Sequence, residues 1–150
     1  MIHELDFQTS YRQFYLSDKD IELQTDSPTF WSKAALASGL ALERGVIGVG
    51  IASYGRVRLS IETFESEPPI LDFEKWDKIT EGSIKIKSGC LQILDCPNSD
   101  IQLEINVSKG DNRVRIYGAN FKTVVGDDGD DFYRIEIWGT AHSERKVLKK

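Results

Sequence analysis

The sequence has few of the residues from which enzyme and metal sites are usually built. It contains two cysteines and two histidines among 150 residues, and His3 and His142 lie near opposite ends of the chain. Neither histidine has a partner at the spacing of a zinc site, and there is no nucleophile elbow or glycine-rich phosphate loop. We therefore expect no enzyme activity, catalytic residue, cofactor or metal, although a histidine or cysteine placed beside carboxylates by the fold would permit a hydrolase.

Long apolar runs are also absent. No stretch approaches the roughly 20 apolar residues of a membrane-spanning helix, and the first six residues lack the basic and apolar regions of a signal peptide. Cys90 and Cys96 stand at the two ends of one expected strand, which would hold them roughly 20 Å apart, too far for a disulfide. Free thiols are typical of a reducing compartment, so we expect a cytoplasmic protein without membrane association.

Basic residues are scarce outside the end of the chain. There are 19 Lys and Arg against 24 Asp and Glu, a formal net charge of −5, and four of the basic residues lie within 145–150. Residues 1–144 therefore hold 15 basic and 24 acidic side chains, a net charge of −9. A body of this sign repels nucleic acid phosphates and attracts basic proteins. The charge argues against direct nucleic acid binding and favours a basic protein partner.

Helical periodicity is nearly absent, and apolar and polar residues alternate with a period of two instead. The pattern is clearest from Ile101 to Trp138, and further strands are expected over 5–16, 47–51, 57–63, 84–86 and 91–93. Short turns between strands, without intervening helices, are typical of an antiparallel sandwich or barrel. We predict an all-β fold with one short helix: an antiparallel β-sandwich that forms a single domain over 1–144, followed by a basic, flexible tail over 145–150.

Turn and cap residues refine this prediction. Tyr54-Gly55 and Ser88-Gly89 stand between consecutive strands and predict two hairpins. Ser27 or Thr29 can cap the one expected helix, Pro28 suits its first turn, and Gly39 can end it.

The segment from Glu65 to Glu81 interrupts the strands. It is rich in carboxylates, and Pro68-Pro69 prevents regular structure. Apolar side chains such as Trp76 predict an ordered excursion anchored on the domain. If this excursion covers Phe132 and Trp138, they form a second small core, which we favour; if it does not, they are an exposed contact surface.

Arginines in the late strands have acidic residues at matching positions. Arg113 and Arg115 alternate with apolar residues, and cross-strand pairs of opposite charge stabilise a sheet. We expect them to pair with Glu104 and Glu136.

The most distinctive local feature is the acidic run Gly126-Asp127-Asp128-Gly129-Asp130-Asp131. Clustered oxygens on a loop can bind calcium, but the spacing is not that of an EF-hand. The same carboxylates can face a basic partner, or they can be a solvated turn without a specific role. All three interpretations remain open at the level of the sequence.

The amino-terminal half resembles a known family. The matching residues are Ser10-Tyr11-Arg12-Gln13-Phe14, then Trp31, Ala34 and Gly39, then Gly45-Val46-Ile47 and the strand Val57-Arg58-Leu59-Ser60-Ile61. Over roughly residues 9–64 this pattern is similar to the competence protein J (ComJ) family, which includes a small acidic inhibitor of the nuclease that acts as DNA enters competent bacteria. The resemblance implies a nuclease inhibitor, and no contact residue is transferred with it.

Charge and resemblance together lead to one hypothesis. A nuclease must hold a polyanion, so a protein that presents carboxylates can occupy its basic cleft. The partner-binding residues expected are carboxylates that imitate phosphates and aromatic anchors: Asp127, Asp128, Asp130, Asp131, Glu65, Glu67, Tyr133 and Trp138. The alternative is a β-sandwich that binds a small ligand or calcium.

Overall fold

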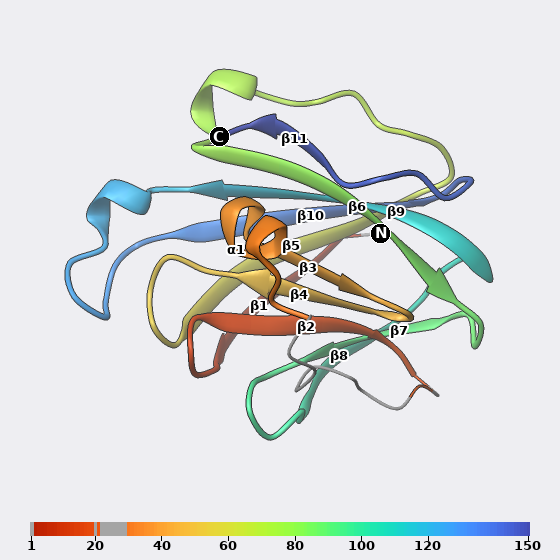
Figure 1. Cartoon of the computed structure of the whole chain (residues 1–150), viewed down its shortest axis with the longest axis horizontal. Helices are drawn as coiled ribbons and strands as arrows, with labels where there is room; N and C mark the ends of the chain where they lie inside the picture. Colours follow the sequence, from red (N-terminus) through yellow and green to blue (C-terminus); the bar gives the residue numbers. More distant parts are fainter. Residues whose placement is uncertain (1, 20, 22–29) are drawn as a thin grey trace.

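The alternating segments of the sequence form two β-sheets that pack face to face (Figure 1). The computed structural model describes residues 2–19, 21 and 30–150, and all statements below refer to these residues. One sheet has six strands in the order β1-β5-β10-β9-β6-β11, and the other has five in the order β3-β4-β2-β7-β8. The predicted all-β sandwich with one short helix is confirmed.

The strand bounds follow the predicted segments closely in the second half of the chain. The six-stranded sheet contains β1 (Ile2–Gln8), β5 (Arg56–Phe64), β6 (Lys78–Ile86), β9 (Gly110–Ala119), β10 (Phe132–Gly139) and β11 (Lys146–Lys149). The five-stranded sheet contains β2 (Gln13–Asp18), β3 (Leu40–Glu43), β4 (Val46–Gly50), β7 (Cys90–Leu94) and β8 (Ile101–Asn106). One pairing departs from an antiparallel arrangement, because β5 and β10 run parallel.

The short turns connect the two sheets and do not form the predicted hairpins. Strand β4 pairs with β2 and β3, whereas β5 pairs with β1 and β10. In the same way β6 pairs with β9 and β11, and β7 pairs with β2 and β8. The hairpin predictions were wrong because alternation with a period of two shows that one face is buried without showing which strand is adjacent.

The expected single strand over residues 5–16 is also divided between the sheets. It is broken at a corner where Tyr11 and Arg12 both have φ of 60°, a conformation that non-glycine residues rarely adopt. The Thr9 hydroxyl donates to the carbonyl of Gln13 at 2.6 Å and thereby closes the corner. Strand β1 therefore ends in one sheet, and β2 begins in the other.

The helix α1 (Lys33–Ser38) is shorter than predicted. The Ser32 side chain accepts from the Ala35 amide as its N-cap, and Gly39 ends it with φ of 71°, as predicted. The predicted cap residues at 27–29 lie outside the described residues. No helix in the described part of the chain is long and apolar enough to cross a membrane.

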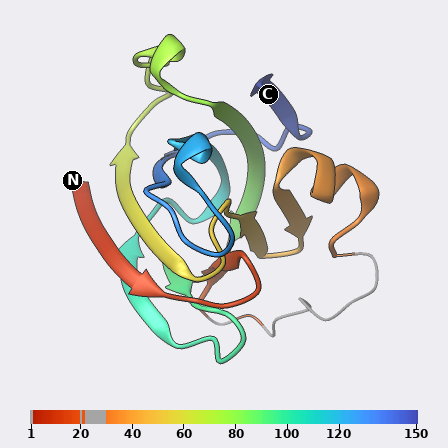
Figure 2. The ribbon, with the colours of Figure 1, turned by 90° about the vertical axis from the view of Figure 1, so that its left-hand side faces the viewer.

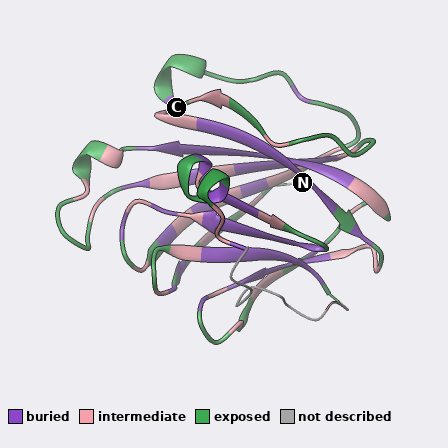
Figure 3. Ribbon diagram, in the orientation of Figure 1, coloured by how far each residue is buried: buried purple, intermediate pink, exposed green. Residues whose placement is uncertain are grey.

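Most apolar side chains lie between the two sheets, where the strands are buried along their length (Figure 3). The cluster draws residues from both halves of the chain, including Phe14, Ile47, Ile61, Ile93 and Ile135. A second cluster, with Phe30 and Trp31, lies on the outer face of the five-stranded sheet beside α1. This packing fixes the positions from which loops and corners extend.

A third, smaller cluster covers the outer face of the six-stranded sheet. Trp76, from the excursion between β5 and β6, contacts Tyr117 and Phe132 at ring-centroid distances of 5.0 and 5.3 Å. The excursion includes the short 3-10 helix η1 (Phe73–Lys75) and returns along the top of the molecule in Figure 1. The favoured prediction of a second small core beneath the excursion is confirmed for Phe132, whereas Trp138 is buried outside this cluster.

The end of the chain differs from the flexible tail predicted over 145–150. Lys146–Lys149 forms β11, which pairs with β6 at the edge of the six-stranded sheet. Figure 2 shows this strand beside β6 and near α1. A charged segment can form an edge strand because its side chains remain in solvent while its backbone completes the sheet.

Candidate functional site

The acidic run lies in the connection between β9 and β10, at the left of Figure 1. The connection contains the 3-10 helix η2 (Phe121–Thr123) and a tight turn in which Val125 and Asp128 exchange backbone hydrogen bonds of 2.8 and 3.3 Å. Gly126 has φ of 65° within this turn, which its missing side chain permits. Val125 begins this turn and is 81% exposed.

Backbone and side-chain contacts tie this loop to the sandwich on several sides. The Thr123 hydroxyl accepts from the Asp130 amide at 2.8 Å, and the Arg58 guanidinium donates to the carbonyl of Gly129 at 3.1 Å. The Tyr54 amide donates to the carbonyl of Asp127 at 2.8 Å. The loop is therefore tied to two other parts of the chain, at Tyr54 and Arg58, and is braced internally by Thr123.

The four aspartates of the run do not converge on a common point. Asp127 lies 3.5 Å from an Arg12 guanidinium nitrogen and Asp130 lies 3.8 Å from Arg58, and all these contacts are partly solvated. Asp128 is exposed, and among the described residues its side chain has no hydrogen bond or ion pair. No group of three or more His, Cys, Asp or Glu in the described residues is placed to hold a metal ion.

Asp131 is oriented inward, unlike the other three. Its Oδ2 accepts from the Ser53 amide at 3.1 Å, the Ser53 hydroxyl at 3.1 Å and the Tyr133 hydroxyl at 2.8 Å. The residue is fully buried, and its Oδ1 has no hydrogen-bond partner. The predicted outward display of Asp131 was wrong, because the end of the run enters the core with β10. Asp131 instead anchors the loop to the turn before β5.

The two predicted aromatic anchors are also buried. Tyr133 belongs to the core between the sheets, and its hydroxyl accepts from the Ala52 amide at 2.7 Å. Burial raises the pKa of Tyr133, and the hydrogen bond to Asp131 raises it further. Trp138 lies beneath the Arg115 guanidinium, 4.9 Å from it. Neither ring is free to contact a partner, so both predictions of an exposed anchor were wrong.

The predicted carboxylates Glu65 and Glu67 are exposed but lie elsewhere. The acidic loop precedes β10, whose Tyr133 is opposite Leu59 of β5, whereas Glu65 and Glu67 follow the other end of β5 beyond Phe64. The length of a strand, roughly 20 Å, separates the two groups. The structure does not bring them together on one surface.

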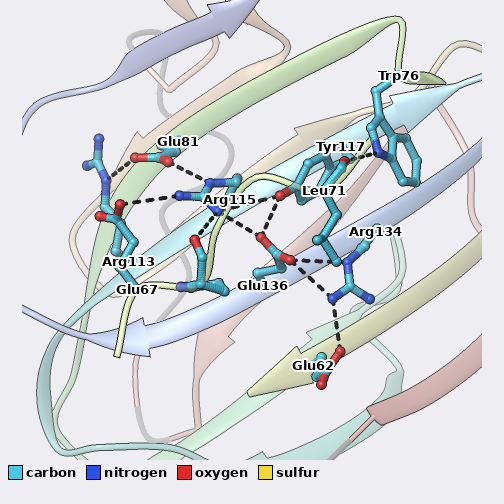
Figure 4. A network of polar contacts seen from close by, with 11 residues as sticks. Glu62, Glu67, Leu71, Trp76, Glu81, Arg113, Arg115, Tyr117, Arg134 and Glu136 are labelled. Carbon is cyan, nitrogen blue, oxygen red and sulfur yellow. Dashed lines mark hydrogen bonds and ion pairs between the residues drawn. The ribbon is translucent and has the colours of Figure 1, made fainter. Parts of the chain in front are cut away.

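A second group of carboxylates lies on the outer face of the six-stranded sheet (Figure 4). Glu62, Glu136, Arg115 and Glu81 stand directly opposite one another on the neighbouring strands β5, β10, β9 and β6. Arg115 joins Glu136 at 3.0 Å to Glu81 at 2.7 Å. Opposite charges that face each other across strands stabilise a sheet and like charges destabilise it, so Arg115 stabilises its row whereas the facing pair Glu62 and Glu136 requires a further cation. The excursion covers this row.

Two more arginines complete this group, which we name the buried charge network: Glu62, Glu81, Arg113, Arg115, Arg134 and Glu136. Arg134 contacts Glu62 at 2.9 Å and Glu136 at 3.1 Å, and Arg113 contacts Glu81 at 3.1 Å. Within these six residues three carboxylates meet three guanidinium groups, so their charges balance, and the exposed Glu67 of the excursion adds a contact of 3.7 Å to Arg115. The negative charge of the body is carried by the other side chains.

The covering excursion takes part in the network. Arg115 donates to the carbonyl of Pro68 at 2.9 Å, and Tyr117 donates to Glu136 at 2.6 Å. Burial lowers the pKa of Arg115, but hydrogen bonds to Glu81 and Tyr117 outweigh this effect, so the pKa is raised. Burial, followed by the hydrogen bond to Glu136, raises the pKa of Tyr117 to about 12.

The predicted arginine pairs were correct in part. Arg115 pairs with Glu136, but Arg113 pairs with Glu81 and not with Glu104. Glu104 lies on β8 in the other sheet, where it accepts from Gln92 at 3.1 Å. Glu81 was missed because it ends the irregular, acidic segment in the sequence, and only the structure shows that it belongs to β6.

The thiols and histidines do not form a catalytic arrangement among the described residues. The Cys90 Sγ lies 3.7 Å from a Glu104 oxygen. Burial and this carboxylate raise the pKa of Cys90, whereas a nucleophilic cysteine needs a lowered pKa. His142 is exposed, and His3 lies on β1 at the far edge of the six-stranded sheet. The geometry gives no support to a hydrolase.

A cavity of about 480 Å³ lies beside the acidic loop. It is bordered by the corner at Arg12, by Trp31, by Lys78 at the start of β6 and by Phe121 of η2. Sequence reasoning missed it, because its walls come from five separate segments. Lys78 looks like any other surface lysine in the sequence.

The arrangement of the two sheets is shared with known structures. It superimposes on ComJ from Bacillus subtilis, an inhibitor of the DNA-degrading activity of NucA, with a TM-score of 0.71 over 93% of this chain and 99% of that chain. This chain has the ComJ fold. The sequences are 19% identical, so the likeness shows the fold alone.

A second structure has the same fold. The product of crocagin biosynthetic gene J matches with a TM-score of 0.56 and 15% identity, over 92% of this chain and 96% of that chain. No protein-family model and no curated protein sequence matches the chain. The ComJ fold therefore occurs in proteins whose names connect them with two different processes.

Proposed function

We propose that this chain is a protein inhibitor of a nuclease and that it docks through the loop between β9 and β10. The docking surface consists of Asp127, Asp128 and Asp130 together with the exposed Val125. It is narrower than the sequence hypothesis, because it leaves out the buried Asp131, Tyr133 and Trp138 and the distant Glu65 and Glu67.

The observation that carries the proposal is the rigid, outward display of carboxylates on this loop. Asp130 and Asp127 are fixed through their backbone groups, by Thr123 and Tyr54 respectively, so their side chains remain exposed. A loop that is ordered before binding loses little conformational entropy when it docks. A solvated turn without a role would not need two tethers from outside the loop, at Tyr54 and Arg58, in addition to the internal contact at Thr123.

Charge supports the same conclusion. Residues 1–144 carry a net charge of −9, and the neutral network on the six-stranded sheet contributes nothing to it. A nuclease cleft that binds DNA is usually basic, and opposite fields accelerate association. Val125 supplies an apolar contact among the charges, which a desolvated interface centre requires.

The similarity in fold to ComJ supports a nuclease as the kind of partner that this chain binds. ComJ inhibits the DNA-degrading activity of NucA, and the matched region spans nearly the whole of both chains. We therefore propose a nuclease as the partner, no direct contact with nucleic acid, and no enzyme activity in the chain itself. Two free thiols in the described residues support a reducing, cytoplasmic location.

The test is inhibition of DNA cleavage by NucA and by nucleases encoded beside this chain's gene. The variant D127N/D128N/D130N removes three negative charges from the loop. We expect it to lower the association rate by roughly tenfold at low ionic strength, and added salt should lower the rate of the unaltered chain similarly.

The matched control removes the same charge elsewhere. Glu43, Glu74 and Glu144 are exposed and distant from the loop in the sequence, so E43Q/E74Q/E144Q changes the net charge equally. We expect this variant to inhibit nearly as well as the unaltered chain. Equal loss in both variants would show that net charge and not the loop determines binding, and no inhibition of any nuclease would overturn the proposed function.

A further inference from the structure

The cavity beside α1 has the size and lining of a small-molecule site. Its volume of about 480 Å³ lies within the range of roughly 300–1,000 Å³ for ligand pockets. Trp31, Leu36, Ile51 and Phe121 contribute apolar side chains, and the backbone of Gly50 completes a wall. Adding a Cβ at Gly50 would bring it within 3.7 Å of the Trp31 ring, so the absence of a side chain helps to keep the space open.

Lys78 is the unusual member of this lining. It is partly buried, and no described residue accepts a hydrogen bond or forms an ion pair with its ammonium group. A Cβ added to Gly39 would lie 2.8 Å from the Lys78 Nζ, so the ammonium group rests against the end of α1. Burial lowers the pKa of Lys78, as expected for a cation that has lost water without gaining a partner.

Lys78 also joins the cavity to two neighbouring hollows. It lines, together with Phe121, a narrow extension of about 20 Å³ between the sheets and an open hollow of about 670 Å³ between α1 and β11. Lys78 therefore borders all three spaces. A ligand that fills the cavity would have this side chain in its wall.

The strained corner between β1 and β2 contributes to the lining of the cavity. Tyr11 and Arg12, both with φ of 60°, line the cavity, and backbone strain of this kind costs about 1 kcal/mol or more per residue and is concentrated at functional sites. The Arg12 guanidinium donates to the carbonyl of Ala52 at 2.5 Å and contacts Asp127. Arg12 thus already has acidic and carbonyl partners, which leaves Lys78 as the unpaired cation of the lining.

We propose that this cavity binds a small molecule composed of an apolar body and one carboxylate, with the carboxylate paired to Lys78 and the apolar body held by Trp31, Leu36 and Phe121. One unpaired cation matches a single negative charge better than the double charge of a phosphate. The Trp31 indole nitrogen donates to the Gln13 side chain at 2.7 Å, which fixes the ring as a wall. This site goes beyond the proposed function and does not depend on it.

The experiment compares decanoate, phenylpropionate and indolepropionate with their uncharged amides. Binding is followed by calorimetry, by the shift in melting temperature and by the tryptophan fluorescence of the intact chain. We expect at least one carboxylate to bind saturably and to raise the melting temperature, and its amide to bind at least tenfold more weakly.

Two variants locate the site. Lys78→Met keeps the apolar stem and removes the charge, so it should weaken carboxylate binding at least tenfold without lowering the melting temperature of the free protein. Leu36→Glu places a repelling charge on an exposed position of the lining and should weaken binding similarly. Lys33→Met, at an exposed lysine of α1 outside the cavity, is the control with equal charge change and should bind normally.

Three outcomes would overturn the site. They are the absence of saturable binding by all the carboxylates, equal binding of carboxylate and amide, and normal carboxylate binding by Lys78→Met. If no carboxylate binds but Lys78→Met weakens inhibition of a nuclease, Lys78 belongs to the protein interface and the small-molecule site is refuted. Failure of nuclease inhibition with normal carboxylate binding would refute only the proposed function.

Discussion

Two groups of carboxylates in this chain differ in their burial and in their pairing with cations. Glu62, Glu81 and Glu136 are placed in a row across the six-stranded sheet, interleaved with arginines and covered by the excursion. Asp127 and Asp128 lie on a loop that extends beyond the sandwich. The first group is buried and neutralised within the protein, whereas Asp127 has only a solvated ion pair with Arg12 and Asp128 has none among the described residues. A carboxylate stays available to a partner where it is exposed, even if a solvated cation lies beside it.

The comparison also shows what each group needs in order to persist. Buried charges must be paired and hydrogen-bonded, since their loss of hydration costs several kcal/mol per ion, to order of magnitude. Every carboxylate of the buried charge network meets a guanidinium group. Exposed carboxylates remain hydrated and need no partner within the protein. Their positions are therefore free to suit the binding of another molecule. The stability of the fold should therefore depend on the network and hardly at all on Asp127 and Asp128.

The largest expected effect comes from breaking the network at its centre. Arg115→Met removes the cation between Glu81 and Glu136, so each of these buried carboxylates loses one of its two guanidinium partners and keeps only Arg113 or Arg134. We expect the free energy of unfolding to fall by about 3–5 kcal/mol, measured by urea denaturation. Arg56→Met, which breaks an exposed ion pair with Asp6, is the control and should keep nearly the original midpoint. Coincident midpoints for the two variants would contradict the assigned importance of the network.

The sequence was sufficient for the fold class and insufficient for the partners of each strand. Alternation around Ile101–Asn106 or Arg56–Phe64 identifies a half-buried strand, because a period of two exposes one face. It does not distinguish a hairpin from a corner between sheets, and the turns at Tyr54 and Ser88 were assigned to the wrong class for this reason. Strand pairing depends on contacts between distant segments, which a local pattern does not contain.

The candidate site, like the fold, could be predicted from the sequence only in part. The acidic run was found because its composition is unusual, but Asp128 and Asp131 are identical in type and three positions apart. Only the placement of Ser53 and Tyr133 makes one of them internal. Lys78 could not be found at all, because its lack of a partner among the described residues is a property of the folded chain.

The buried Asp131 and the exposed Asp128 allow the same comparison of carboxylates within a single loop. Asp131→Ala leaves the Ser53 amide, the Ser53 hydroxyl and the Tyr133 hydroxyl without their shared acceptor, and we expect a loss of about 2–3 kcal/mol in the free energy of unfolding. Asp128→Ala removes the same charge from an exposed position and should change it by less than about 0.5 kcal/mol. Equal effects in thermal or urea denaturation would show that the inward orientation of Asp131 contributes nothing.

The smallest effect concerns the hydrogen bond from Tyr117 to Glu136, at 2.6 Å in the buried charge network. Tyr117→Phe should lower the free energy of unfolding by about 1.5 kcal/mol at neutral pH, the value of a hydrogen bond to a charged group. Below pH 10, Tyr117 keeps its proton in both the folded and the unfolded chain, so its ionisation adds no pH dependence there.

Stability at alkaline pH tests the same hydrogen bond through the ionisation of Tyr117. The ordinary pKa of 10.0 is raised to about 12 in the folded chain, so between these values the unfolded chain releases the proton and the folded chain retains it. The stability of the unaltered chain must then fall as pH rises, whereas Tyr117→Phe lacks this loss. Urea midpoints measured at successive pH values should therefore converge for the two proteins. A constant difference across this range would mean that Tyr117 ionises as freely in the network as in water, which a buried donor to Glu136 cannot do.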